Sequence, residues 1–200
     1  MVLLITDRDK LIISYLEKYR YATIEQLEKM FFKEQQYSYN IVRKRLGEIR
    51  KAGYIKIHRD IETNKNIYIW NEDRIKPPSW HRIILLNVLT EMVSQGYKVE
   101  IFKIEKEWMD RKIRSDGFVV FTIGTRRYHF FIEVQISNNP NNLEKYDILY
   151  KTNEVQKYLG KDFFPRVLLI SDAEYNFSNL KHTSIIQLDT KLNKFSSILI

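Results

Sequence analysis

The sequence contains no cysteine, no apolar stretch of about 18 residues, no internal repeat and no low-complexity tract. Without cysteine, disulfide bonds and thiolate-ligated metal sites are excluded. Without a long apolar stretch, we expect no membrane span. The first ten residues, MVLLITDRDK, are apolar for only five positions and have no basic leader, so we expect a strand or arm here rather than a signal peptide, and a cytoplasmic protein.

The composition allows one large domain or two small ones. The chain has 200 residues, of which 44% are hydrophobic, and a net charge of +8, which permits a polyanionic partner. Residues 1–70 hold 14 basic and 9 acidic side chains, whereas residues 71–200 hold 19 and 16. The polar segment NEDRIKPPS ends near Pro77-Pro78 and separates these parts. We therefore predict a domain over 1–70, a linker over 71–79 and a second domain over 80–200.

Residues 1–70 carry the pattern of three helices followed by a hairpin. Thr6 and Thr23 suit helix N-caps, and Gln26 follows Thr23 at capping-box spacing. Ser38 and Gly53 are suited to the start and end of a third helix. After Gly53, the segments YIKIHR and NIYIW alternate as strands around a short polar turn, which predicts a hairpin.

The third predicted helix is strongly basic. Five of the nine residues 43–51 are Lys or Arg and one is acidic. This order of elements, with VRKRLGEIRKAGYI leading into the hairpin, resembles a winged helix-turn-helix, which implies a helix in the DNA major groove and a wing on the backbone or minor groove. A module for protein contacts is the alternative. The predicted contacts with double-stranded DNA are Asn40, Arg43, Lys44, Arg45, Lys51, Lys56, Arg59 and Lys65.

The second part reads as helix, strand, hairpin, helix and strand, an α/β pattern. The long helix begins after Ser79 and ends at Gly96. Gly124-Thr125 suits a two-residue turn with glycine first, so DGFVVFTIGTRRYHFFIEVQIS is predicted to be a hairpin. In that register Asp116 faces Glu133 across two strands.

The stretch FFIEVQIS, residues 130–137, alternates in polarity. Its even positions, such as Phe130 and Ile132, are expected to build a core, and its odd positions place Glu133 and Gln135 on the other face. Facing carboxylates repel each other, which is tolerable if both are exposed and splayed or if a divalent cation lies between them. The odd face is therefore either solvated or the place of a reaction.

Asp116 followed by Glu133-Val-Gln135 resembles the PD-(D/E)xK nuclease core. The resemblance implies a restriction-endonuclease-like mixed sheet, with Asp116 and Glu133 as ligands of Mg²⁺ or Mn²⁺. Gln135 stands where that motif has its lysine, and Ser115 stands where it has its proline. Lys145 on the following helix is a candidate source of the missing charge, while Glu105 and Glu107 are expected to be solvated charges rather than further ligands.

The two parts together resemble the replication-relaxation family of plasmid and mobile-element proteins. The segments HRIILLNV and SDGFVVF…YHFFIEVQ carry this resemblance, which also matches His81 and Asn87 to residues on the first helix of the family's second domain. His81 is a weak site candidate, because His81 and Asn87 do not share a helix face. The resemblance implies a role in plasmid replication, copy control, or DNA relaxation or mobilisation.

From the sequence we expect an α+β or α/β protein: a winged helix followed by a nuclease-like domain. We expect a DNA-binding protein of a plasmid or phage that is not an enzyme, because the charged residue of the nuclease motif is replaced. The alternatives are a metal-dependent DNA nickase or endonuclease using Asp116, Glu133 and Gln135, and a protein-interaction module. Homodimerisation, or binding to replication or mobilisation proteins, is compatible with each of these functions.

Overall fold

The computed structural model describes residues 4–33, 38–60, 64–71, 78–136 and 143–199. These residues form two compact units, Met1–Thr90 and Glu91–Ile200. Residues 72–77 of the predicted linker 71–79 lie outside the described residues. The division between the units falls within a helix that begins at Trp80, so each unit is taken by itself below.

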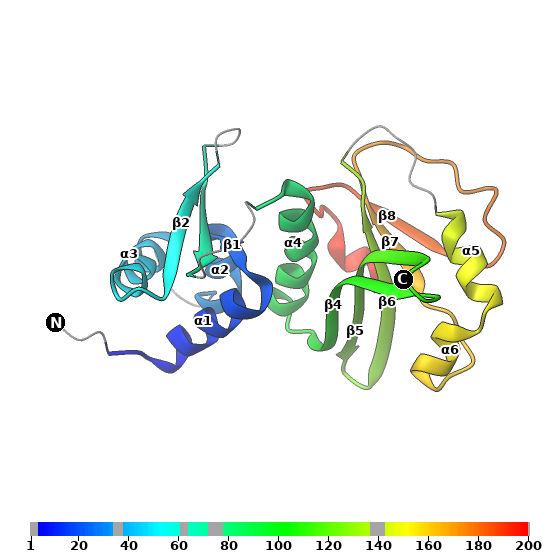
Figure 1. Ribbon diagram of the computed structural model, residues 1–200, viewed down its shortest axis with the longest axis horizontal. Coiled ribbons are helices and arrows are strands. Elements are labelled where there is room, and N and C mark those ends of the chain that lie inside the picture. The colour runs from blue at the N-terminus through cyan, green and yellow to red at the C-terminus, as the bar shows by residue number, and fades with distance from the viewer. Residues whose placement is uncertain (1–3, 34–37, 61–63, 72–77, 137–142, 200) are drawn as a thin grey trace. The chain divides into compact units, whose positions relative to one another are not determined.

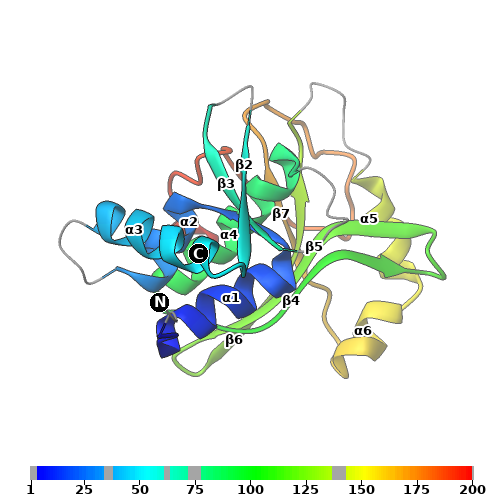
Figure 2. The ribbon, with the colours of Figure 1, turned by 60° about the vertical axis from the view of Figure 1, so that its left-hand side comes forward.

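The first unit combines helices with a small antiparallel sheet of strand order β1-β3-β2 (Figures 1 and 2). Thr6 and Thr23 cap the first two helices, and each forms a reciprocal capping box, with Asp9 and Gln26 respectively. The elements are α1 (Asp7–Tyr19), β1 (Tyr21–Thr23), α2 (Ile24–Phe31), α3 (Ser38–Lys51), β2 (Ile55–Arg59), β3 (Asn66–Trp70) and α4 (Trp80–Ser94).

The third helix and the hairpin lie where the sequence predicts them. Val42, Leu46 and Ile49 of α3 are fully buried, so helical periodicity sets which face of α3 meets the core. Strands β2 and β3 pair antiparallel from Ile55–Trp70 to Arg59–Asn66. The opposite face of α3 is consequently left to solvent.

The start of α4 is bonded to α2. Gln26 Nε2 donates to the Ile83 carbonyl at 3.0 Å and to Asn87 Oδ1 at 2.7 Å. Asn87, one of the two residues that carried the family resemblance on this helix, thus has a structural role within the first unit.

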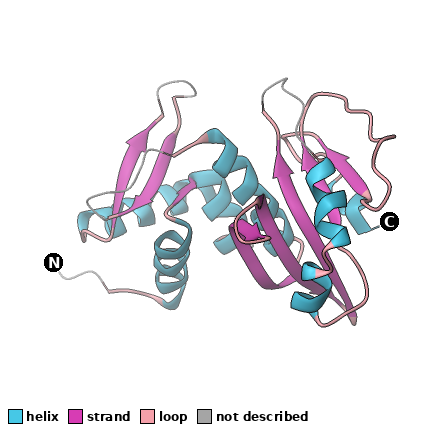
Figure 3. Ribbon diagram, turned by 45° about the vertical axis from the view of Figure 1, so that its right-hand side comes forward, coloured by secondary structure: helices cyan, strands magenta, loops and turns pink. Residues whose placement is uncertain are grey.

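The second unit is built on a five-stranded mixed sheet of order β4-β5-β6-β7-β8 (Figure 3). Strands β4, β5 and β6 pair antiparallel, whereas β6, β7 and β8 pair parallel. The arrangement is mixed α+β with a mixed sheet, as the sequence predicts. The elements are β4 (Lys98–Trp108), β5 (Ile113–Ile123), β6 (Arg126–Val134), α5 (Glu144–Lys151), α6 (Glu154–Leu159), β7 (Arg166–Ile170), β8 (Ile185–Leu188) and a final 3₁₀ turn η1 (Phe195–Leu199).

The predicted β5–β6 hairpin is confirmed in its turn and register. Ile123 pairs with Arg126 across Gly124-Thr125, and the ladder runs without a slip to Gly117 and Ile132. Gly124 has a φ of 57°, a left-handed conformation that glycine adopts at little cost. The next pair in this register is Asp116 and Glu133.

The interpretation of β6 as a strand with one buried face is wrong. Phe130, Phe131, Ile132 and Glu133 are all buried, whereas Ile136 is exposed. The physical reason is that β6 lies between β5 and β7, and side chains of α5 cover its odd-numbered face; the rings of Phe131 and Tyr146 lie 4.7 Å apart. Glu133 therefore projects into a protein core rather than into water.

Candidate functional site

The outer face of α3 is a basic surface. Asn40, Arg43, Lys44 and Lys51 are exposed, as is Arg50 between them. Arg43, Lys44, Arg50 and Lys51 have no ion pair with any residue in the described part of the chain. Four unpaired cations on one helix repel one another, so this face favours an anionic partner.

Arg45, which the sequence groups with these cations, is placed differently. Its Nε donates to Asp9 Oδ1 at 2.8 Å, a second nitrogen bonds Asp9 Oδ2, and a third lies 2.5 Å from Glu48 Oε2. Asp9 is only 1% exposed, and its pKa is lowered to about 2. Burial by itself raises this pKa, but the hydrogen bonds from Arg45 and Thr6 lower it by a larger amount. The guanidinium of Arg45 thus connects α1 to α3 within the fold.

The hairpin β2–β3 presents three further predicted contacts, Lys56, Arg59 and Lys65, all exposed. Arg59 Nε donates to Asn64 Oδ1 at 2.7 Å, and Lys65 Nζ lies 3.4 Å from Glu25 Oε1. Exposed pairs of this kind contribute little to stability, so these side chains can exchange partners readily.

In the second unit, Asp116 and Glu133 lie at the point where the β5–β6 ladder ends. Asp116 Oδ2 accepts a hydrogen bond from the Val134 backbone nitrogen at 2.8 Å. The Asp116 carboxylate therefore reaches across to the β6 backbone beside Glu133. The two carboxylates interact, since the negative charge of Asp116 is one cause of the raised pKa of Glu133.

Glu133 is held by two neighbouring residues of α5. Lys145 Nζ lies 2.7 Å from Glu133 Oε1, and the Tyr146 hydroxyl donates to the same oxygen. Lys145 also donates to the Arg114 carbonyl at 2.8 Å. Of the predicted site residues, the structure therefore brings together Asp116, Glu133 and Lys145.

Burial governs the ionisation of this cluster. Glu133 is 2% exposed, and its pKa is raised, first by burial and then by Asp116, while Lys145 and Tyr146 oppose the increase. Burial, followed by the charge of Glu133, holds the pKa of Tyr146 well above its ordinary value. Tyr146 therefore stays a neutral donor to Glu133.

Of the remaining predicted residues, Gln135 is half-buried, and its backbone nitrogen donates to the Ile170 carbonyl at 2.9 Å. His81 belongs to α4 in the first unit, whereas the cluster is built from the second unit alone. Glu105 and Glu107, which lie in β4, pair with Arg114 at 4.0 Å and Arg111 at 3.1 Å.

Sequence reasoning missed Tyr146. Its signal is present in the helix, because Leu143, Tyr146 and Leu149 follow one another at a spacing of three and are all buried. This spacing identifies the face of α5 that packs on the sheet, and a tyrosine in that face needs a partner for its hydroxyl. The opposing strand offers Glu133.

Two carboxylates are enough protein ligands for a divalent cation. Mg²⁺ is usually bound by one or two carboxylates, and water or substrate phosphates complete its near-octahedral shell of oxygen ligands. Within the described ranges, no group of three or more His, Asp or Glu side chains is arranged to hold a metal ion. Asp116 and Glu133 supply two carboxylates, and the Lys145 ammonium already occupies one oxygen of Glu133.

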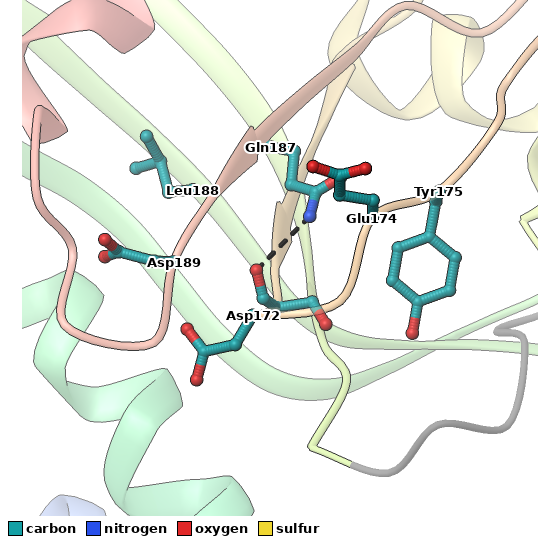
Figure 4. Close-up of a pocket in the computed structure, with 7 residues that line it drawn as sticks. Asp172, Glu174, Tyr175, Gln187, Leu188 and Asp189 are labelled. Carbon is teal, nitrogen blue, oxygen red and sulfur yellow. Dashed lines mark hydrogen bonds between the residues drawn. The ribbon is translucent and has the colours of Figure 1, made fainter.

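A shallow recess of about 480 Å³ lies at the carboxyl ends of β7 and β8 (Figure 4). Several of its polar groups are bonded to one another or to nearby residues: Gln187 Nε2 donates to the Ser171 carbonyl at 3.2 Å, and Asp172 accepts from the Thr190 hydroxyl at 2.7 Å. Asp189 accepts from Asn193 at 2.8 Å. Tyr175 also lines the recess, and its buried hydroxyl has no hydrogen-bond partner in the described part of the chain.

No helix of the described chain is both long and apolar enough to cross a membrane.

Comparison with known proteins gives two solved structures of low similarity. The chain matches no protein-family model and no curated protein. The restriction endonuclease FokI is 12% identical with a TM-score of 0.31, and FokI bound to DNA is 14% identical with a TM-score of 0.32. Each alignment covers 95% of this chain and 44% of the FokI chain, so the chain spans less than half the length of FokI. Similarity this low carries no argument about function, and the resemblance to replication-relaxation proteins gains no support from a family match.

Proposed function

We propose that the protein binds double-stranded DNA through the first unit, with α3 as the recognition helix and β2–β3 as the wing of a winged helix-turn-helix. The observation that carries the proposal is the exposed basic face of α3, whose four cations have no ion pair to a described residue and suit a polyanion. The order α1-β1-α2-α3-β2-β3, with its three-stranded antiparallel sheet, supports the same assignment. Arg45 is excluded from the DNA contacts because its donors bond Asp9 and Glu48.

A gel-shift titration over a range of salt concentrations tests this function. Each phosphate contact that is lost lowers the magnitude of the salt slope by about one, so the double variant Arg43→Ala/Lys44→Ala should reduce it by roughly two. The control Lys10→Ala/Lys18→Ala removes the same charge from exposed positions on α1 and should leave the slope unchanged. Binding of the unmodified protein that does not weaken with salt would favour the protein-interaction module instead.

The role of the second unit in this proposal is that of a nuclease-like scaffold without cleavage. Gln135 replaces the motif lysine, and Lys145 and Tyr146 both bond Oε1 of Glu133, so a metal ion would compete with the ammonium group of Lys145 for that oxygen. The resemblance to replication-relaxation proteins then suggests plasmid or phage replication, copy control, or DNA relaxation or mobilisation as the process. Cytoplasmic location and association as a homodimer, or with replication proteins, belong to the same proposal.

A second candidate function is metal-dependent nicking or cleavage of DNA. The observation favouring it is that Lys145 brings to Glu133 the positive charge that Gln135 lacks. Asp116 and Glu133 would then be the residues that hold Mg²⁺ or Mn²⁺, and the metal would polarise the scissile phosphate. Incubation of supercoiled plasmid with the protein and either metal separates the two functions. Nicking by the unmodified protein that disappears in Asp116→Asn would show that the second unit is a nuclease rather than a scaffold.

A further inference from the structure

Gly47 occupies an unexpected position in the middle of α3. Glycine is the poorest helix former after proline, so a glycine in a helix interior needs a reason. Apart from its chain neighbours and its own helix backbone, a side-chain carbon built at Gly47 would meet no atom of the described chain within 4 Å, and the backbone of Gly47 is not in the left-handed region. Neither packing nor backbone geometry within the fold therefore requires glycine here.

The neighbours of Gly47 on the helix surface are all cationic. Residues three and four positions away along a helix lie beside a given residue, and for Gly47 these are Arg43, Lys44, Arg50 and Lys51. At about 100° per residue, two of them lie on each side of Gly47, so the glycine is at the centre of the basic arc. All four side chains are exposed.

The nearby acidic residue does not neutralise this arc. Glu48 lies 2.5 Å from Arg45 and is thereby directed toward the α1 side of the helix. The result is a bare patch of helix backbone framed by four positive charges. Such a patch is complementary to a negatively charged surface that lies close to the helix backbone.

We propose that Gly47 is the point of closest approach between α3 and the DNA duplex, and that its missing side chain sets how deeply the helix docks. An α-helix backbone has a radius of about 2.3 Å, against roughly 5–6 Å with side chains, so a glycine allows the duplex to approach more closely. The four surrounding cations can then reach phosphates on either side of the contact. This inference rests on the proposed function of α3.

Substitution at Gly47 should separate stability from binding. Gly47→Ala and Gly47→Leu both improve helix propensity, and the Cβ that each adds meets no neighbouring element of the described fold, so each should raise the melting temperature by a few degrees. Both should weaken binding to a short random-sequence duplex, measured by fluorescence anisotropy at fixed salt. The loss should grow with side-chain size and reach about tenfold or more for leucine, a loss of about 1.4 kcal/mol in binding free energy.

Ser14→Leu provides a matched control, because it adds a leucine at an exposed position of α1. It should leave the affinity unchanged. A Gly47→Leu protein that binds the duplex as tightly as the unmodified protein would overturn the inference, and so would a Gly47→Ala protein that loses both stability and affinity. If the unmodified protein itself shows no salt-dependent binding, the proposed function fails, and the inference fails with it.

Discussion

Replacing Arg45 with methionine should lower the free energy of unfolding of the first unit without removing a DNA contact. The substitution keeps much of the aliphatic side chain but leaves the Asp9 carboxylate, 1% exposed, without its guanidinium partner. Breaking a buried ion pair on one side costs about 3–5 kcal/mol. We expect a value near the lower end, about 3 kcal/mol, because the Arg45 side chain is 22% exposed and the pair is partly solvated.

The pKa of Asp9 reflects the same interaction together with the hydrogen bonds from Thr6 and the opposing effect of burial. A shift from 3.8 to about 2 corresponds to roughly 2 kcal/mol of preference for the ionised carboxylate in the folded protein. Because the folded-state pKa is the lower one, this stabilisation is present above about pH 4 and is lost as the pH falls toward 2. The destabilisation caused by Arg45→Met should therefore be largest near neutral pH and should shrink at about pH 3.

Urea denaturation followed by far-UV circular dichroism at the two pH values measures this difference. Arg43→Met is the control, because Arg43 is exposed on the same helix and has no ion pair to any described residue; its effect should stay within about 0.5 kcal/mol. The reasoning would be refuted if Arg45→Met cost no more than Arg43→Met, or if its cost were the same at both pH values.

Three further predictions concern the other polar contacts. Gln26→Leu should destabilise the first unit by about 1–3 kcal/mol in the same urea assay, because it leaves the buried Thr23 backbone nitrogen without its acceptor and Asn87 Oδ1 without its donor. Lys145→Met should lower the melting temperature by removing the cationic partner of the buried Glu133 carboxyl, and adding Glu133→Gln should recover much of the loss; no recovery would mean that the ionisable carboxyl of Glu133 is not the cause. Asp147→Ala should speed hydrogen exchange at the amides of Lys181 and His182, which donate to it, while the exchange of β6 stays unchanged.

The local features of the fold were predictable because they depend on short-range rules. The turn at Gly124-Thr125 fixes the β5–β6 register through turn chemistry alone, and the register then aligns Asp116 with Glu133. The helical stripe of Val42 and its neighbours likewise fixes which face of α3 is exposed.

The partners of individual charged residues were not predictable from the sequence pattern. Arg45 lies among the basic residues of α3, and only the packing of α1 against that helix brings Asp9, 36 positions earlier, to its guanidinium. Glu133 was expected on a solvated or reactive face, because alternation cannot show that α5 covers it with Tyr146. Contacts that decide a side chain's role are long-range, whereas periodicity reports only which face it occupies.

In the hydrogen bond between Asp116 and Val134, a side-chain oxygen takes the place of a backbone acceptor of the sheet. The β5–β6 ladder ends at Gly117 and Ile132, and the Asp116 carboxylate supplies the acceptor that a backbone carbonyl of β5 would provide if the pairing continued. A substitution that removes this oxygen, such as Asp116→Ala, therefore shortens the sheet by one hydrogen bond as well as removing a charge. Asp116→Asn keeps an acceptor in place, so the two variants together distinguish the electrostatic role of this position from its role in holding the end of the sheet together.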